Sequence, residues 1–205
     1  MITISSIPIM ADSMQIIVKS DVPFAQLPLT AGVEGEEFEF PLGWRMFKPN
    51  AMSEVPGTLV DIAQTMAKAT KAPAISAYSG ASGYLGLVFC EKGKGTDLVV
   101  TGVERAKEAK LVDAKYKHHP LVAIGVSSSW SKKAKLKHDY DALKAAANRE
   151  PGVGEGGEDL LLTWLVGLGI PGCHDVDPYW NEVGGVLTAQ RKAFWTPSFE
   201  IDINL

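Results

Sequence analysis

Apolar and polar residues alternate in several short segments of the chain, a pattern that is typical of β-strands. The first two candidates are the apolar run 14–18 and the segment 33–40, which reads VEGEEFEF. Three more follow at 74–78, 84–90 and 96–103, and the glycine-rich turns SGASG and EKGKG separate them. Because turn residues stand between consecutive strand patterns, this part of the sequence predicts two hairpins in an antiparallel meander.

Further strands are expected in the second half of the chain. The apolar run 121–126 predicts one strand. The C-terminal tail predicts three more, at 186–189, 192–195 and 198–203, where apolar residues fall at alternate positions of the last segment. These segments would extend the sheet that the meander begins.

Helical periodicity is found in three longer segments. One helix is expected to begin at Ser53, a favourable capping residue, and to end near residue 71. A second is expected over 131–149, which is rich in strong helix formers. The segment 158–168 is apolar nearly all round and predicts a buried helix. The charged segment 106–116 fits either a short helix or an exposed arm.

These elements together predict an α+β fold, with a mostly antiparallel sheet and about three helices packed on it. The length of 205 residues suits a single domain over 1–205, and no internal repeat divides the chain. The segment PGVGEGG at 151–157 combines four glycines with a proline, so we expect a flexible loop or a boundary there.

Composition narrows the class of protein. Apolar residues make up 46% of the chain and charged residues 21%, which is ordinary for a globular protein and excludes disorder as its dominant state. Two cysteines cannot form a disulfide framework. The N-terminal segment lacks the basic start of a secretory signal, and no apolar run reaches the roughly 20 residues of a membrane span. We therefore expect a soluble, cytoplasmic protein without a membrane partner.

Charge is unevenly distributed along the chain. The net charge is −4, yet residues 104–150 hold 11 Lys or Arg against 6 Asp or Glu, whereas the rest holds 9 against 18. The basic region 105–137 is one alternative site, because lysines can bind nucleic-acid phosphates by releasing counterions. The region has few arginines and aromatic residues, and the whole chain is acidic, so nucleic acid is not the favoured partner.

The densest cluster of reactive side chains follows the helix predicted at 158–168. It consists of Cys173, His174, Asp175 and Asp177. These groups would suit a small hydrolase or transferase that uses Cys173 or His174, with Asp175 or Asp177 as the orienting or general-base carboxylate. Neighbouring residues seldom chelate one ion together, so we expect neither a metal site nor a cofactor here. The structural alternative is a turn in which the polar side chains cap the backbone.

The favoured interpretation is a protein-binding module, such as an inhibitor, an immunity-like protein or an assembly factor. No catalytic motif is specific enough to outweigh it, whereas segregated charge and aromatic residues in turn-like segments suit a protein interface. The residues expected to contact a partner protein are Trp44, Tyr179, Trp180, Lys132, Lys133 and Lys135.

Overall fold

Six strands and five α-helices form the part of the chain that the structure describes. The computed structural model describes residues 12–91, 94–149 and 156–173. The strands are β1 (Ser13–Lys19), β2 (Gly35–Phe40), β3 (Trp44–Pro49), β4 (Ala74–Gly80), β5 (Tyr84–Glu91) and β6 (Lys94–Thr101). The helices are α1 (Leu59–Thr70), α2 (Val103–Glu108), α3 (Pro120–Lys133), α4 (Tyr140–Asn148) and α5 (Gly157–Leu168).

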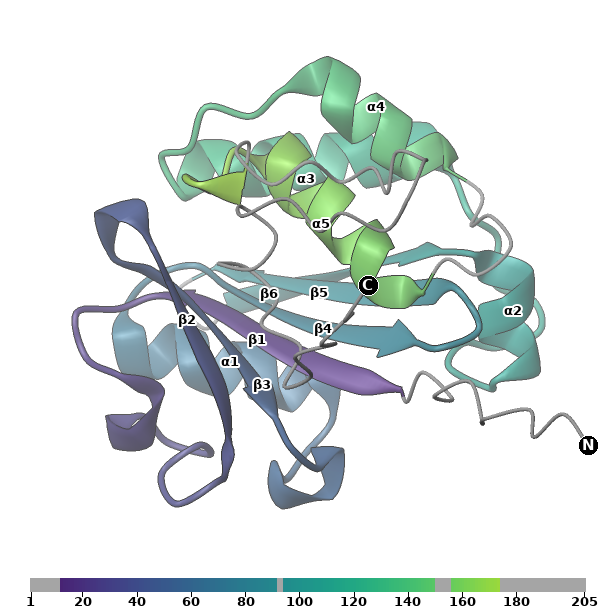
Figure 1. Ribbon diagram of the computed structural model, residues 1–205. Coiled ribbons are helices and arrows are strands. Elements are labelled where there is room, and N and C mark those ends of the chain that lie inside the picture. Colours follow the sequence, from purple (N-terminus) through teal and green to yellow (C-terminus); the bar gives the residue numbers. More distant parts are fainter. Residues whose placement is uncertain (1–11, 92–93, 150–155, 174–205) are drawn as a thin grey trace, which may run out of the picture.

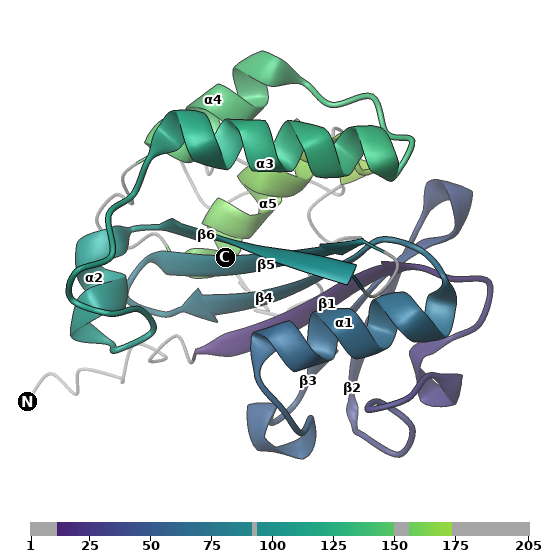
Figure 2. The ribbon, with the colours of Figure 1, turned by 180° about the vertical axis from the view of Figure 1, so that it is seen from behind.

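The strands form one antiparallel sheet in the order β2-β3-β1-β4-β5-β6. The predicted meander is confirmed as β4, β5 and β6, and the first two predicted strands are β1 and β2. Helix α1 covers one face of the sheet, and α3, α4 and α5 cover the other (Figures 1 and 2). Helix α2 lies at one end of β5 and β6. The α+β class expected from the sequence is therefore confirmed.

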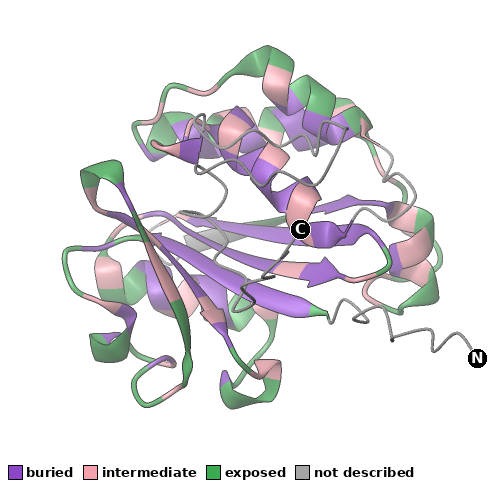
Figure 3. Ribbon diagram, in the orientation of Figure 1, coloured by how far each residue is buried: buried purple, intermediate pink, exposed green. Residues whose placement is uncertain are grey.

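Two hydrophobic cores lie on opposite faces of the sheet. Successive side chains of a strand point to opposite faces, so β1 contributes to both cores. Ile16 and Val18 pack in the core beneath α1, whereas Ile17 packs with α3, α4 and α5. The central strands are consequently buried along nearly their whole length (Figure 3). Exposed residues are found on the outer helix surfaces, in the loops and along the edge strand β2.

Helix α1 begins later than the sequence predicted. Ser53 lies in a short 3-10 turn, Met52–Glu54, and the α-helix is capped instead by Thr58. The Thr58 Oγ1 accepts a hydrogen bond from the backbone N–H of Asp61, and the Asp61 carboxylate accepts one from the backbone N–H of Thr58. This reciprocal capping box satisfies two N–H groups at the start of the helix, which the Ser53 position does not achieve.

The predicted strand at 121–126 is wrong, because these residues form the first half of α3. Pro120 occupies the first turn, where its missing N–H costs nothing, and its fixed φ favours a helix. The helix predicted over 131–149 is also wrong in its first part. Lys135 adopts a left-handed conformation with φ of 59°, which ends α3, and Asp139 then caps the separate helix α4.

Strand β3 was not expected, and its first residue corrects one prediction of the partner site. The side chain of Trp44 is only 1% exposed. Its ring packs against Trp130 of α3, with 5.8 Å between the ring centroids. A partner protein therefore has no access to Trp44, which belongs to the core instead.

The remaining sequence predictions fall at the end of the chain and beside α5. The buried helix predicted at 158–168 is confirmed as α5, which ends at the left-handed Gly169. The strands predicted at 186–189, 192–195 and 198–203 lie outside the described residues. Of the predicted loop 151–157, the structure describes only the last two residues, which are the cap and first residue of α5. Within the described ranges, no helix combines the length and apolarity needed to cross a membrane.

Candidate functional site

Cys173, the proposed nucleophile, lies just beyond α5 in an apolar environment. Its side chain is fully buried in the core formed with α3, α4 and α5. Burial raises the pKa of this thiol well above its ordinary value, because the thiolate would lose its hydration. A nucleophilic cysteine needs a lowered pKa and an approach for substrate, so the surroundings of Cys173 do not favour this role. His174, Asp175 and Asp177 lie outside the described residues.

We expect the thiols of Cys90 and Cys173 to be protected in the native protein, because both side chains are buried. Alkylation by iodoacetamide at pH 8 should be about 100-fold slower than in denaturant, because the reagent cannot reach a buried thiol unless the fold opens. At Cys173 the raised pKa lowers the thiolate fraction as well. Mass spectrometry of tryptic peptides would measure the rate at each cysteine. Rapid native labelling of Cys173, with Cys90 still protected, would contradict this prediction and restore Cys173 as a candidate nucleophile.

Three of the predicted partner-binding residues lie together at the end of α3. We define the lysine corner as Lys132, Lys133, Lys135 and Lys137, and all four residues are exposed. Lys133 forms an ion pair with Glu91 of β5 and still leaves 54% of its side chain exposed. The other two aromatic candidates, Tyr179 and Trp180, lie outside the described residues.

The backbone of the lysine corner is held in place by the elements around it. The backbone N–H of Leu136 donates to Ser131 O at 2.9 Å, and that of Asp139 donates to Gly167 O of α5 at 2.9 Å. Trp130, at the base of the corner, is buried, and its indole N–H donates to Cys90 O at 3.2 Å. The corner is therefore a turn with a fixed backbone that presents exposed lysine side chains.

The basic region 105–137 is divided into two separate surfaces. Helix α3 is 14 residues long, so its ends lie about 20 Å apart. The lysine corner lies at its C-terminal end, whereas α2 lies near the other end (Figure 2). Lys107 is a residue of α2, and Lys117 lines the same pocket as Lys107. Between the corner and these two lysines, the exposed Leu121 and Val122 carry no charge. A strand of nucleic acid would meet two basic surfaces here instead of one continuous track.

The structure also contains a polar network that the sequence did not predict. Gln15 and Ser79 are buried, and the Ser79 hydroxyl donates to the Gln15 Oε1 at 3.0 Å. The Gln15 amide donates to the Ser13 Oγ at 2.7 Å, and Ser13 donates to the Glu158 Oε1 at 2.6 Å. Lys48 completes the network through an ion pair of 2.7 Å with Glu158. The only sequence signal was a glutamine within an apolar strand pattern.

This polar network lies beside a pocket of about 460 Å³ at the end of β1 and β4. The residues of the network come from β1, β3, β4 and α5, so they meet only when the chain folds. Within the described ranges, the residues lining this pocket include neither a histidine nor a cysteine. The hydrogen bonds described above attach the first turn of α5 to the sheet.

Neither metal chemistry nor a known relative identifies the site. Among the described residues, no group of three or more His, Cys, Asp or Glu side chains could hold a metal ion. Comparison with protein-family models, curated proteins and solved structures finds no match. The interpretation of function therefore rests on the geometry and charge of the surface.

Proposed function

We propose that this chain is a protein-binding module that docks an acidic surface of a partner protein against the lysine corner. The observation that carries the proposal is the display of four exposed lysines within six residues on a turn with a fixed backbone. A positive surface of this kind steers an acidic partner and selects against basic ones. Because the turn is already ordered, binding would not have to order the backbone.

The exposed side chain of Tyr140, which follows the lysine corner in the chain, also favours an interface with a protein. Tyr140, the first residue of α4, is 54% exposed although it is a large aromatic residue. Tyrosine combines apolar area with a hydroxyl group and is frequent at the energetic centre of protein interfaces. The lysine corner and Tyr140 would thus supply charge and an aromatic anchor to the same partner.

Two alternative functions receive less support. The burial of Cys173 weakens the case for a cysteine hydrolase or transferase. The division of the basic region by Leu121 and Val122 weakens the case for a nucleic-acid track. The lysine corner needs neither a reactive thiol nor a continuous basic groove, so protein binding remains the function that the surface favours.

The double variant Lys135→Glu, Lys137→Glu should weaken binding of the partner about tenfold or more, because close charge pairs at interfaces contribute at least that much. Proteins captured from a lysate of the source organism would be quantified by mass spectrometry. The affinity of each purified candidate would then be measured at several salt concentrations. A partner that fits the proposal has an acidic surface and binds the wild-type chain more weakly as salt is added.

The matched control is Lys68→Glu, Lys71→Glu at the end of α1, the helix that covers the opposite face of the sheet. Both control residues are exposed, and Lys71 shares the left-handed backbone of Lys135, with φ of 54° and 59° respectively. The control should bind the partner as the wild type does. Equal binding by both double variants, or an equal loss in both, would contradict the proposed role of the lysine corner.

A further inference from the structure

Helix α3 has one exposed face, and the residues on that face change in character from the first turn to the last. Figure 2 shows α3 at the outside of the helical layer, in front of α4 and α5. In an α-helix, residues three or four positions apart lie on the same face. The exposed residues of α3 follow this spacing, and they are Leu121, Val122, Gly125, Ser129, Lys132 and Lys133. We call this surface the α3 face.

The first turn of the α3 face is apolar. Leu121 is 79% exposed and Val122 is 62% exposed, and Leu121 is the most exposed large apolar side chain in the described part of the chain. No residue between 120 and 131 carries a charge, so the uncharged surface continues along the helix as far as its last turn. Covering Leu121 and Val122 would remove apolar area from water, which favours association with another apolar surface.

Gly125, in the middle of the α3 face, is not required by the packing of the described residues. A Cβ added at this position would meet no atom within 4 Å, so the fold has room for a side chain there. A glycine inside a helix also lowers stability relative to alanine. The missing side chain does, however, let another molecule come close to the helix backbone. Gly125 therefore favours a partner that packs closely across the middle of α3.

The last turn of the α3 face is basic. Lys132 and Lys133 lie on this face and belong to the lysine corner. Glu91 neutralises Lys133 through an ion pair, whereas Lys132 forms no ion pair with any of the described residues. Lys135 and Lys137 add two exposed positive charges just beyond the helix. Charge complementarity therefore selects an acidic partner at this end of α3.

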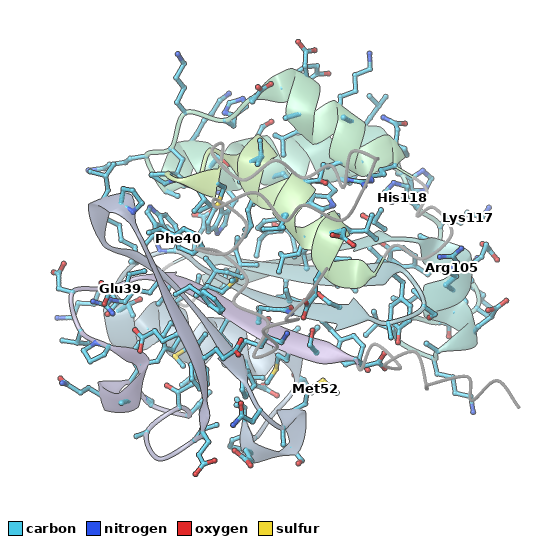
Figure 4. All side chains as sticks on the ribbon, in the orientation of Figure 1. Glu39, Phe40, Met52, Arg105, Lys117 and His118 are labelled. Atoms are coloured by element: carbon cyan, nitrogen blue, oxygen red, sulfur yellow. The ribbon has the colours of Figure 1, made fainter. Side chains whose placement is uncertain are left out.

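A second copy of this chain would be a poor partner for the α3 face. Two parallel copies of α3 would place their lysine corners side by side. In the antiparallel arrangement, the corner of one copy would approach the first turn of the other, close to Lys117. Lys117 is exposed three residues before α3, at the end of the molecule where α2 is found (Figure 4). Like charges would meet in both arrangements, which disfavours them.

A membrane surface also matches the α3 face poorly. A helix that lies in a bilayer interface has a large apolar face along its length. The large exposed apolar residues of α3 are confined to its first turn, at Leu121 and Val122. A partner helix needs no more than a short apolar contact, because its remaining turns would face Gly125 and the lysines. The α3 face thus suits a second helix better than a lipid bilayer.

We propose that the α3 face docks an amphipathic, partly acidic helix of a partner protein in antiparallel orientation. The first turns of the partner helix would place acidic residues at the lysine corner, and its later turns would place apolar residues on Leu121 and Val122. Acidic residues are favourable at a helix N-terminus, and antiparallel packing brings that positive end of the dipole to the negative end of α3. This docking mode rests on the proposed function, because the same partner contacts the lysine corner.

Two synthetic peptides test the docking mode against the full-length chain. Each has the 14-residue length of α3 and is held helical by an internal hydrocarbon bridge. The first peptide carries glutamates in its early turns and leucines on one face of its later turns, and its isomer has the reverse order. Fluorescence anisotropy would follow binding. We expect a Kd below about 100 µM for the first peptide and binding about fivefold weaker or less for the isomer.

Variants of the α3 face identify the contacts. Leu121→Gln removes apolar area and Gly125→Gln fills the gap, so each should weaken binding of the first peptide about fivefold or more. Both positions are exposed, so the variants are expected to fold, which circular dichroism would verify. The matched control is Leu98→Gln. Leu98 is 44% exposed on β6 and pairs with Val88 of the core beneath α1, on the other face of the sheet, so the affinity should not change.

The outcomes distinguish this docking mode from the proposed function. Absence of binding by either peptide at about 1 mM, or equal binding of both isomers without any effect of Gly125→Gln, would overturn the docking mode alone. If Lys135→Glu, Lys137→Glu also fails to weaken capture of a partner protein, the proposed function is overturned with it. Tighter binding to phosphatidylserine vesicles that Leu121→Gln abolishes would replace the helix by a membrane. Dimerisation of the chain that Gly125→Gln abolishes would replace it by a second copy.

Discussion

Replacing Gly157 by alanine is expected to destabilise the folded protein by about 3 kcal/mol or more. Gly157 is the first residue of α5, and it lies directly against the hairpin between β4 and β5. An added Cβ would overlap with the carbonyl oxygen of Tyr84 and lie 2.7 Å from the Gly80 nitrogen. Both neighbours are backbone atoms, so they cannot move aside without displacing the strands. Urea denaturation followed by circular dichroism would measure the loss.

Gly125 provides the matched control, because the same substitution there meets nothing within 4 Å. Gly125 is an exposed residue in the middle of α3. Alanine favours the helical backbone more than glycine does, so Gly125→Ala should stabilise the protein by about 0.5 to 1 kcal/mol. The two substitutions thus have opposite expected signs. A Gly157→Ala variant as stable as the wild type would show that α5 does not approach the hairpin this closely.

The close contact between Gly157 and the β4–β5 hairpin also determines the geometry of the polar network. Glu158 is the next residue of α5, and its carboxylate accepts hydrogen bonds from Ser13 and Gln15. If alanine pushes the start of α5 away from the sheet, the buried Gln15 loses part of its hydrogen bonding. Unsatisfied buried polar groups cost about 1 to 3 kcal/mol each, which adds to the steric penalty.

Local sequence patterns predicted the central strands because the burial of each of their residues depends on its position along the strand. Strands β4 and β5 alternate between two cores, and glycine-containing turns separate them, so short segments contained all the necessary information. The run 121–126 misled the prediction for a physical reason. Its apolar residues are those of a strand, but Leu121 and Val122 are exposed on a helix, and Pro120 favours that helix. Short apolar runs do not distinguish the two structures.

The candidate sites were harder to predict because tertiary contacts create them. Trp44 follows a turn-like segment, and only packing against Trp130 reveals that it belongs to the core. The basic region was visible as a count of lysines, yet α3 separates its two ends. In the polar network, Ser13 and Glu158 are 145 residues apart in the chain. No local pattern links such residues, so the sequence predicted the lysines of the corner but not the pocket beside the polar network.

Trp164→Ala is expected to destabilise the protein by about 3 to 5 kcal/mol, the usual cost of removing a fully buried indole. Trp164 is 0% exposed in the core between α5 and the sheet. Its indole N–H donates to the Thr101 Oγ1 of β6 at 3.0 Å. The substitution would therefore leave a cavity and remove the hydrogen bond that joins α5 to the edge of the meander. Urea denaturation followed by circular dichroism would detect the loss.

One further variant separates packing from hydrogen bonding at Trp164, and a second provides a control at the surface. Trp164→Phe keeps most of the apolar area but not the N–H donor, so it should cost less than the alanine variant. Its cost should still include about 1 kcal/mol for the lost hydrogen bond. Tyr140→Ala removes an aromatic ring that is 54% exposed and should change stability by less than about 0.5 kcal/mol. If Trp164→Ala were no more destabilising than Tyr140→Ala, α5 would not pack on the sheet through this indole.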